Sequence, residues 1–373
     1  MNGDAGKCLF MLPNWHRIGH MFMEPCVYLN ITEYDKKNVV FLVPNVSPAN
    51  AYAAHIVGRY ADVRTSPEFQ KLYTLSLESD QVYCDNYRLV SWHNGFLEDF
   101  HKKATARPDS LEYFFLDKKD VKLGLLLDKS LGIDHDARVV ALHSREPGYL
   151  PSLTYHGYRD SNITNFNKSI DYLIDQGYVV VRIGDPSMTP LAPRKNLFDL
   201  AITADKHPFA DIWFILRARF MIGTTSGPIM IPIYFNMPPL LVVNKIPRLP
   251  MLLPAGSRFM PKKLYSNKRG RLMTLKEIKC AGFEFDMLED YNRRDLVVME
   301  NTEDEILDAV IEMDNNIRSG LNDLFDHELQ KKYDKTMSYI AKYVKKNTGE
   351  NYMYINTNRL ATSFLKRHPW FVD

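Results

Sequence analysis

The sequence predicts an α/β protein built from two Rossmann-like domains. In the C-terminal half, short runs of apolar and β-branched residues alternate with helical patterns. Strands that are apolar on both faces are typical of a parallel sheet covered on two sides. A fainter version of the same alternation precedes this half, and 373 residues suit two domains at roughly 100–200 residues each.

The C-terminal half is expected to contain four buried strands, over 138–142, 178–183, 220–222 and 240–243. Helices are expected over 164–177, 211–219 and 229–235. A further helix is expected from Thr302, where Thr302 and Glu305 have the spacing of a capping box.

The N-terminal half is expected to begin with strands over 7–11 and 38–43, each followed by a helix, the first after Gly19 and the second over 49–60. We place an N-terminal domain at 1–125 and a second domain at 126–320. C-terminal helices over 321–373 are expected to pack back on the N-terminal domain. The boundary follows the charged, loosely patterned sequence between Lys102 and Asp136.

Composition narrows the class of protein. The 47 Lys and Arg nearly balance the 45 Asp and Glu, which does not favour nucleic acid as a partner. Four widely spaced cysteines without a C-x-x-C pair favour a reducing, cytoplasmic location, and the N-terminus lacks the apolar segment of a secretory signal. Residues 220–244 carry no charge, but their glycines and prolines predict short buried elements instead of a membrane span.

Polar or glycine-rich segments follow all four predicted strands, at 143–148, 184–187, 223–228 and 244–245. The carboxyl ends of parallel strands share one edge of a sheet, and ligands bind beyond that edge in open α/β folds. The sequence therefore predicts a ligand site where these segments meet.

Several residues of these segments suit an anionic ligand. Arg145 could bind a diphosphate through two hydrogen bonds. The turn of Gly223, Thr224, Thr225, Ser226 and Gly227 could bind phosphate at a helix start, or could be a plain turn with Ser226 as the helix cap. The remaining candidate ligand-binding residues are His143, Arg159, Gly184 and Asp185. A histidine that leaves a strand is also commonly structural.

Glu146 and Asp160 are the two candidate general bases, with loop salt bridges or helix capping as the alternative. In the N-terminal half, His16, Arg17 and Gly19 join a strand to a helix and are expected on the acceptor side of an interdomain cleft. Because G-x-G-x-x-G, Walker and G-x-S-x-G motifs are absent from the sequence, nicotinamide enzymes, P-loop NTPases and α/β-hydrolases are not favoured. The sequence shows no convincing metal-ligand spacing, so no metal is expected.

Four segments in order, HSREPGYL, YRDSNITNF, YVVVRIGDPSM and FMIGTTSGP, resemble a family of bacterial glycosyltransferases from gene clusters for surface polysaccharides and other glycans. HRIGHMFMEPCVYL and ENTEDEILDAVIEM extend the resemblance, which covers about residues 10–315. The His-x-Arg after a strand is distantly similar to the nucleotide-sugar-binding motif of fucosyltransferase-like enzymes.

This resemblance implies a GT-B architecture, in which two Rossmann-like domains face each other across a cleft. It implies a metal-independent enzyme without a cofactor that moves a sugar from a nucleotide-sugar donor to a glycan or lipid-linked acceptor in surface polysaccharide or lipopolysaccharide synthesis. Arg145 and the Thr224–Gly227 turn would bind the donor phosphate. The alternatives are a nucleotide-sugar epimerase or hydrolase of the same architecture and a non-catalytic glycan- or nucleotide-binding module.

Residues 248–271 interleave basic and apolar side chains. Such a surface could contact an anionic membrane leaflet that carries lipid-linked acceptors. The alternative is a solvated loop near the cleft. The sequence does not indicate an oligomeric state.

Overall fold

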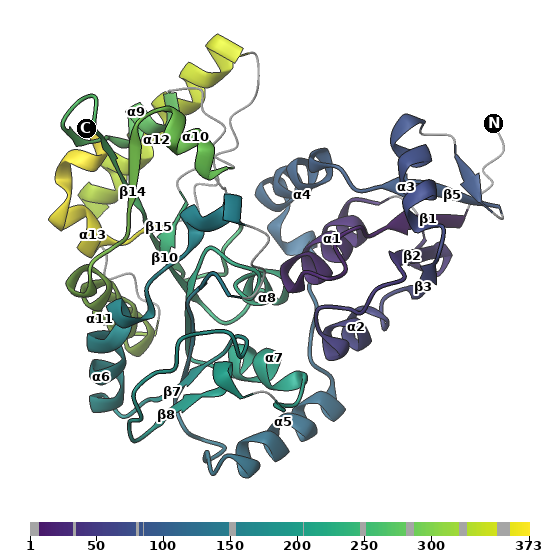
Figure 1. Ribbon diagram of the computed structural model, residues 1–373, viewed down its shortest axis with the longest axis horizontal. Helices are drawn as coiled ribbons and strands as arrows, with labels where there is room; N and C mark the ends of the chain where they lie inside the picture. Colours follow the sequence, from purple (N-terminus) through teal and green to yellow (C-terminus); the bar gives the residue numbers. More distant parts are fainter. Residues whose placement is uncertain are drawn as a thin grey trace. The chain divides into compact units, whose positions relative to one another are not determined.

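The computed structural model describes residues 7–32, 35–79, 82–84, 86–148, 154–203, 205–246, 251–280, 287–320, 327–348 and 359–373. The chain divides into two compact units, residues 1–118 and 119–373. Each unit contains its own parallel sheet with helices beside it (Figure 1). The dividing point lies at the start of helix α5 (Lys118–Ser130), ahead of the boundary at 125/126 that the sequence pattern suggested.

The first unit contains a five-stranded sheet in the order β3-β2-β1-β5-β4. All its pairs are parallel except β4 with β5. The strands are β1 (Lys7–Met11), β2 (Val39–Pro44), β3 (Asp62–Ser66), β4 (Tyr83–Cys84) and β5 (Tyr87–Ser91). The helices are α1 (Ile18–Ile31), α2 (Ala51–Val57), α3 (Phe69–Glu78) and α4 (Asn94–Ala106), with 3-10 turns η1 (Lys36–Asn38) and η2 (Pro108–Ser110).

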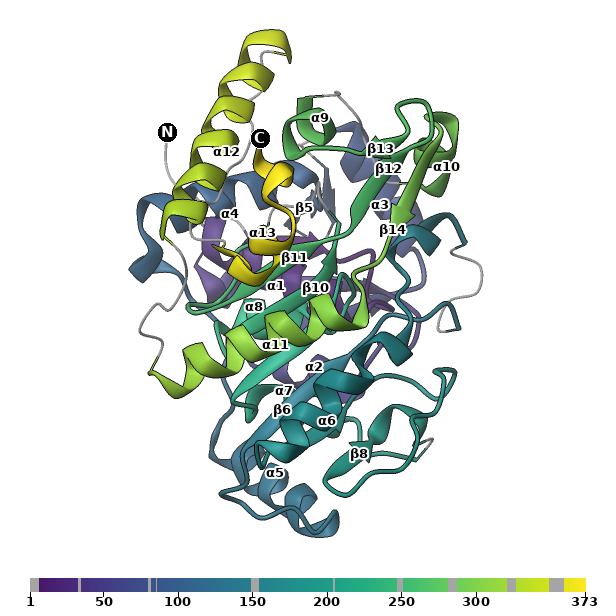
Figure 2. The same cartoon turned by 90° about the vertical axis from the view of Figure 1, so that its left-hand side faces the viewer.

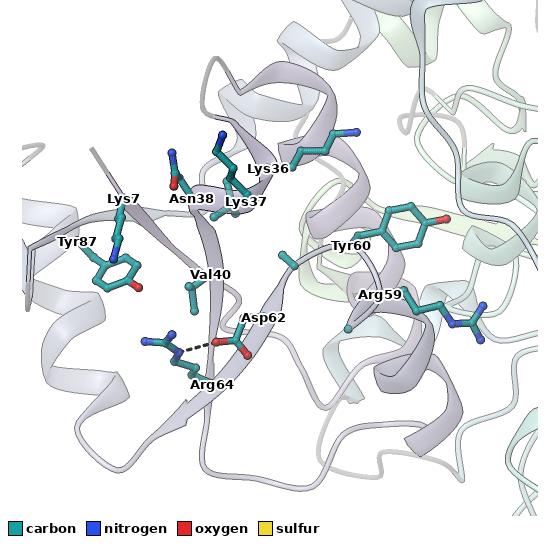
Figure 3. A pocket seen from close by; sticks show the side chains of 13 residues that line it. Lys7, Lys36, Lys37, Asn38, Val40, Arg59, Tyr60, Asp62, Arg64 and Tyr87 are labelled. Atoms are coloured by element: carbon teal, nitrogen blue, oxygen red, sulfur yellow. Dashed lines mark hydrogen bonds and ion pairs between the residues drawn. The ribbon is translucent and has the colours of Figure 1, made fainter. Parts of the chain in front are cut away.

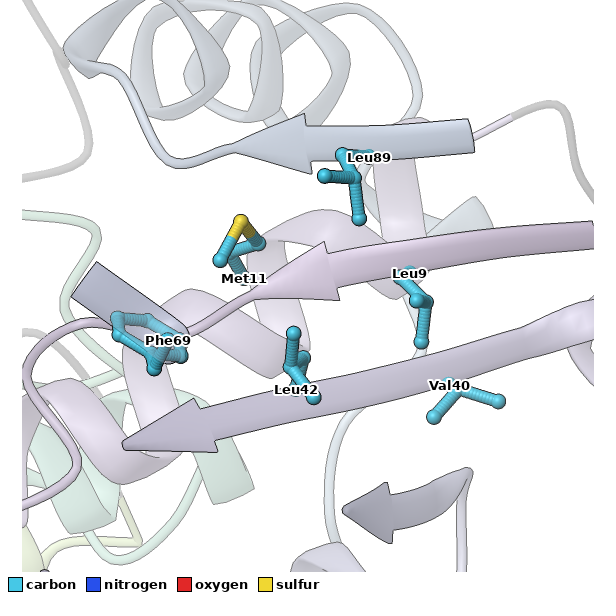
Figure 4. Packing of buried hydrophobic residues seen from close by; sticks show 6 residues of the cluster. All are labelled: Leu9, Met11, Val40, Leu42, Phe69 and Leu89. Atoms are coloured by element: carbon cyan, nitrogen blue, oxygen red, sulfur yellow. The ribbon is translucent and has the colours of Figure 1, made fainter. Parts of the chain in front are cut away.

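Alternation along β1 explains why both faces of this sheet are covered. Successive side chains of a strand point to opposite faces. Leu9 and Met11 join a buried cluster with Phe69 of α3 (Figure 4). Phe10, between them, stacks on Tyr28 of α1 at 3.6 Å between ring centroids. An apolar strand thus packs on α3 with one face and on α1 with the other.

The second unit is built on a seven-stranded sheet in the order β15-β11-β10-β9-β6-β7-β8, in which every neighbouring pair is parallel. Its strands are β6 (Val139–His143), β7 (Val179–Arg182), β8 (Leu197–Asp199), β9 (Phe220–Thr224), β10 (Leu240–Lys245), β11 (Arg258–Pro261) and β15 (Arg359–Leu360). The four strands predicted in this half are confirmed, and so is their common direction.

Helices cover both faces of the seven-stranded sheet. They are α6 (Asn167–Asp175), α7 (Phe209–Leu216), α8 (Met230–Phe235) and α11 (Glu303–Arg318), and the 3-10 turns near them are η3 (Thr154–Arg159), η4 (Ile163–Phe166) and η5 (Leu200–Ile202). α6 and α11 lie together on one face, and α7 and α8 lie on the other (Figure 2). Thr302 and Glu305 form the predicted capping box of α11.

A three-stranded antiparallel sheet follows β11 and was not predicted. It consists of β12 (Lys263–Ser266), β13 (Arg271–Leu272) and β14 (Leu296–Met299), beside helices α9 (Leu275–Cys280) and α10 (Leu288–Arg293). The interpretation of 248–271 as a solvated loop is wrong for 258–264, which are buried in β11 and β12. Residues 247–250 lie outside the described residues, and the turn at 267–270 is exposed.

The described residues after 320 belong to the second unit. They form α12 (His327–Thr348), β15, α13 (Thr362–Arg367) and η6 (Pro369–Val372). β15 pairs with β11, α13 packs on α11, and α12 packs on α9. The expected contact of this segment with the first unit stays a prediction.

The uncharged stretch 220–244 forms β9, α8 and the start of β10, as expected for short buried elements. Within the described ranges, none of the helices combines the length and the apolar character that a bilayer span requires.

Candidate functional site

The carboxyl ends of β6, β9, β10 and β11 lie side by side, because these strands are neighbours in one parallel sheet. Arg145 follows β6, and its backbone N–H donates to Oγ1 of Thr224, at the end of β9, at 2.8 Å. The two segments predicted to bind phosphate, the one with Arg145 and the Gly223–Gly227 turn, are therefore in direct contact. We call this edge of the second-unit sheet the strand-end site.

The Gly223–Gly227 turn links neighbouring strand ends. Besides Thr224, Thr225 accepts the N–H of Ile246 through Oγ1 at 3.2 Å. Both hydroxyl groups accept a bond from a backbone N–H, and both residues are buried in the turn, at 0% and 2% exposed. A Cβ at Gly223 would lie 2.4 Å from Ile229, so close packing requires glycine there.

Ser226 does not cap α8. Its Oγ donates to the carbonyl of Thr224 at 2.8 Å, and the residue at the N-cap position is Ile229, which makes no side-chain cap. The carbonyl of Gly227 accepts the N–H of Met230 at the helix start. The alternative of Ser226 as a plain helix cap is therefore wrong. Ser226 is half-buried and lies at the strand-end site.

The loop of Tyr158–Asn162 packs on the strand-end site and brings Asp160 to Arg145. The guanidinium of Arg145 forms an ion pair with the Asp160 carboxylate, and the two side chains are 19% and 25% exposed. The carbonyl of Arg145 also accepts the N–H of Ser161 at 2.9 Å, and Asn244 donates to the Ser161 hydroxyl at 3.0 Å. Burial lowers the pKa of Arg145, and nearby Arg159 lowers it further.

Lys262 is a cation of this site that sequence reasoning missed. It follows β11, is only 3% exposed, and donates from Nζ to the carbonyl of Asp160 at 2.5 Å. Asp160 thus contacts Arg145 through its carboxylate and Lys262 through its backbone. Burial lowers the pKa of Lys262 to about 8. The charge of Glu300 raises this pKa, and the charge of Arg145 lowers it. Two neighbouring cations of this kind favour an anionic ligand.

Arg159 lies beside the same loop and is half-buried. Its Nε donates to the hydroxyl of Tyr158 at 3.1 Å, and its guanidinium lies 5.4 Å from the centre of that ring. Arg159 therefore adds positive charge near Arg145, and its contacts with Tyr158 fix its position.

Glu146 points away from Arg145. Its carboxylate accepts from Arg182 at 2.5 Å and from the N–H of Thr189 at 2.8 Å. Arg182 is fully buried and also pairs with Asp199 at 3.1 Å. Glu146 is therefore held in a buried ion-pair network, which corresponds to the salt-bridge alternative, and of the two candidate bases only Asp160 contacts Arg145.

The end of β6 and the segment after β7 are tightly packed. His143, the last residue of β6, is buried, contacts the carbonyl of Ile183 through Nδ1 at 3.2 Å, and has a pKa lowered to about 4 by burial. This matches the structural alternative for that histidine. Gly184 has φ +150°, and a Cβ there would lie 2.3 Å from Met188. Asp185 accepts the N–H of Ser187 through Oδ1, while its buried Oδ2 has no hydrogen-bond partner among the described residues.

In the first unit, His16, Arg17 and Gly19 lie between β1 and α1, as expected. His16 is exposed, and its pKa is lowered by burial and by Arg17 and His20. Arg17 is half-buried and Gly19 is buried. The Nε of Arg17 has no hydrogen-bond partner within the described part of the chain. Their predicted role toward an acceptor stays a prediction.

The first unit also has a basic cavity of about 460 Å³ at the opposite edge of its sheet, where β1, β2, β3 and β5 begin (Figure 3). Its cations are Lys7, Lys36, Lys37, Arg59 and Arg64. All but Lys7 pair with carboxylates: Lys36 with Glu112, Lys37 with Asp35, Arg59 with Asp117 and Arg64 with Asp62. These pairs offset much of the positive charge of the cavity.

Among the residues with described positions, no three or more His, Cys, Asp or Glu side chains gather closely enough to hold a metal ion. The strand-end site contains cations, hydroxyls and amides, which suit a phosphate, and also the Asp160 carboxylate that pairs with Arg145.

No protein-family model matches the chain, and no curated protein matches it. Among solved structures, it is similar to the ADP-heptose lipopolysaccharide heptosyltransferase II of E. coli, with a TM-score of 0.45 and 11% identity over 68% of this chain and 90% of that one. It is also similar to a family 9 glycosyl transferase from Veillonella parvula DSM 2008, with a TM-score of 0.38 and 10% identity over 64% of this chain and 81% of that one. Similarities at this level do not identify a reaction.

Proposed function

We propose that the protein is a glycosyltransferase of the GT-B type that takes a sugar from a nucleotide-sugar donor. The observation that carries this proposal is the strand-end site. There the backbone N–H of Arg145 donates to Thr224, and the side chains of Arg145 and Lys262 both contact Asp160. This edge of a parallel sheet is where α/β proteins bind nucleotides. The fold alone would not specify the reaction.

In this proposal, Arg145, Lys262 and the Thr224–Gly227 turn bind the phosphates of the donor. Negative charge develops on the phosphate oxygen as the bond to the sugar breaks. Cations and hydroxyl donors that already point to that place stabilise the transition state electrostatically. Two cations suit a diphosphate better than a monophosphate.

Asp160 has a defined part in this mechanism. Its carboxylate pairs with Arg145 when no donor is bound. That contact uses only Nη1 of the guanidinium, so a donor phosphate that binds through Nη1 would compete with the carboxylate. A carboxylate that is paired with a guanidinium is also a weak base, so we do not assign proton transfer to Asp160.

The protein is proposed to act in the cytoplasm, in the synthesis of a bacterial surface glycan, with a glycan or lipid-linked acceptor and without a metal. The two units are proposed to face each other across a cleft, with the acceptor bound by the first unit. The His16–Gly19 segment, at the carboxyl edge of the first sheet, supports this placement of the acceptor.

The experiment is to incubate the protein with UDP-, GDP-, ADP-, dTDP- and CMP-sugars, with EDTA, in the presence and absence of n-octyl glycosides as acceptors. We expect one donor to be consumed with release of its nucleotide, and consumption to increase with an acceptor. Arg145→Ala should lower the rate at least about 100-fold, the effect of removing one transition-state hydrogen-bond donor. Lys268→Met, in the exposed turn after β12, is the matched control and should not change the rate.

Conversion of a donor to another nucleotide sugar without acceptor would indicate an epimerase instead. Tight binding without consumption of any donor would indicate a binding module. Either result contradicts the proposed transfer, and an unchanged rate in Arg145→Ala contradicts the role of the strand-end site.

A further inference from the structure

A histidine and a buried glutamate lie one helical turn apart at the start of α1. The Nδ1 of His20 and Oε1 of Glu24 are 2.8 Å apart. The same oxygen accepts from Nδ2 of Asn14 at 2.9 Å. The Glu24 side chain is 1% exposed, whereas the His20 side chain is 32% exposed. The pair therefore has a buried carboxylate end and an accessible imidazole end.

The hydrogen bonds bear on the tautomer of His20. Oε1 of Glu24 accepts from Asn14 and faces Nδ1 of His20. An ionised carboxylate only accepts, so Nδ1 of His20 carries the proton. The other ring nitrogen, Nε2, is then left with its lone pair. This is the arrangement in which a histidine serves as a general base and a carboxylate fixes its tautomer.

The position of the pair is that of a ligand site. It follows β1, at the carboxyl edge of the first-unit sheet, beside the exposed His16 and the half-buried Arg17. The titratable groups around it are Arg17 and His16, which belong to the same turn, and the hydroxyl of Tyr73 from α3, whose pKa is raised by burial and by Glu24. These groups leave Glu24 as the negative charge beside the imidazole.

Stabilisation of the helix by an i,i+4 pair does not by itself explain this arrangement. His–Glu pairs four residues apart stabilise helices when both groups are exposed, by a small amount. Here the carboxylate is almost completely buried in an otherwise apolar helix, and burying a charge is unfavourable unless it is well paired. An apolar residue at position 24 would avoid that cost but would lose the hydrogen bond from Asn14.

We propose that His20 is the general base of the transfer reaction and that Glu24 orients it and stabilises its protonated form. This rests on the proposed function. The acceptor hydroxyl gives its proton to Nε2 of His20 while its oxygen forms the bond to the anomeric carbon of the donor sugar. The bond from that carbon to the phosphate oxygen breaks, and its electron pair leaves on the nucleotide. The resulting imidazolium is paired with the Glu24 carboxylate until it returns the proton to solvent.

The test uses the full chain with the donor found in the screen and an n-octyl glycoside acceptor. His20→Gln is expected to lower kcat about 100- to 10,000-fold, the usual contribution of a positioned base. Its affinity for the nucleoside diphosphate, measured by calorimetry, should stay within about twofold, since that ligand binds the second unit in our proposal. His55→Gln, an exposed histidine of α2, is the matched control and should keep full activity.

Glu24→Gln separates a catalytic pair from a structural one. It keeps the shape of the side chain but cannot stabilise the imidazolium, so the acidic limb of the kcat–pH profile should move to lower pH and kcat should fall. His20→Ala, which leaves space for a small base, should recover part of its lost activity when imidazole is added. Circular dichroism and thermal unfolding establish that each variant is folded.

The outcomes separate this inference from the proposed function. If the wild-type protein consumes no nucleotide sugar, the proposed function fails and this inference fails with it. If the wild-type protein transfers sugar and folded His20→Gln does so equally well, only the inference is overturned. Loss of activity in His20→Ala without recovery by imidazole, together with an unshifted pH profile in Glu24→Gln, also overturns it.

Discussion

Replacing Glu146 with glutamine tests whether this residue holds the fold or performs proton transfer. Its carboxylate is hydrogen-bonded to Arg182, whose side chain is fully buried. Breaking a buried ion pair by removing one partner costs about 3–5 kcal/mol. Asp199 still pairs with Arg182 at 3.1 Å, and the glutamine oxygen can still accept the N–H of Thr189. We therefore expect a loss below that range, about 2–3 kcal/mol.

The assay is thermal unfolding of the full chain, measured by differential scanning calorimetry. For a unit of this size the expected loss corresponds to a decrease in Tm of about 4–12 °C. The matched control is Asp171→Asn, which removes a carboxylate that is 57% exposed and pairs with Arg194. Such surface pairs contribute about 0–1 kcal/mol, so this variant should unfold close to the wild-type Tm.

Transfer by Glu146→Gln, measured well below its Tm, should stay near the wild-type rate. A variant that unfolds at the wild-type temperature and has lost transfer would refute this reasoning, because Glu146 would then act in the reaction and not in the fold.

Three further results are expected. Asp160→Asn should bind nucleoside diphosphate more tightly by calorimetry, because an uncharged amide competes less strongly for Arg145 than a carboxylate; weaker binding would contradict its place in the mechanism. Nucleoside diphosphate affinity should fall as pH rises through about 8, where Lys262 loses its charge, and this fall should be absent in Lys262→Met. An equal fall in the variant would show that another group causes the pH dependence. Burial lowers the pKa of His143 from 6.5 to about 4, so the unfolded state binds a proton that the folded state does not. Stability should therefore decrease as pH falls from about 6.5 towards 4, and a thermal-unfolding series with His143→Gln should show a smaller decrease; an equal one would exclude His143 as the source.

The buried strands of the second unit could be predicted because their side chains are apolar on both faces. β6, β7, β9 and β10 are short β-branched runs bounded by glycine or polar residues, and their common direction follows from the helices between them. That the residues after them share an edge follows from this topology. Arg145 and Thr224 were for this reason predictable as neighbours.

The partners of individual side chains were not predictable in the same way. Both candidate bases, Glu146 and Asp160, lie in loops. No local sequence pattern indicates that Glu146 pairs with the buried arginine of β7, or that Asp160 pairs with Arg145. These contacts depend on long-range packing. Lys262 was missed because β11, β12 and the residue between them include Arg258, Lys262 and Lys263, and basic residues in short strands resemble a solvated loop.

The pair in α1 had a visible signal. His20 and Glu24 are polar residues four positions apart in an otherwise apolar helix, and this spacing places them on one face. The pattern indicates proximity, whereas the burial of Glu24 and the bond from Asn14 required the structure.

Binding of the nucleoside diphosphate of the identified donor, by isothermal titration calorimetry, tests the central claim most directly. Arg145→Met should weaken binding about 10-fold or more, the effect of losing a hydrogen bond to a charged group. Arg64→Met, which removes a cation from the basic cavity of the first unit, should bind like the wild-type protein. Undiminished binding by Arg145→Met, with loss of binding in Arg64→Met, would place the nucleotide in the first unit and contradict the account.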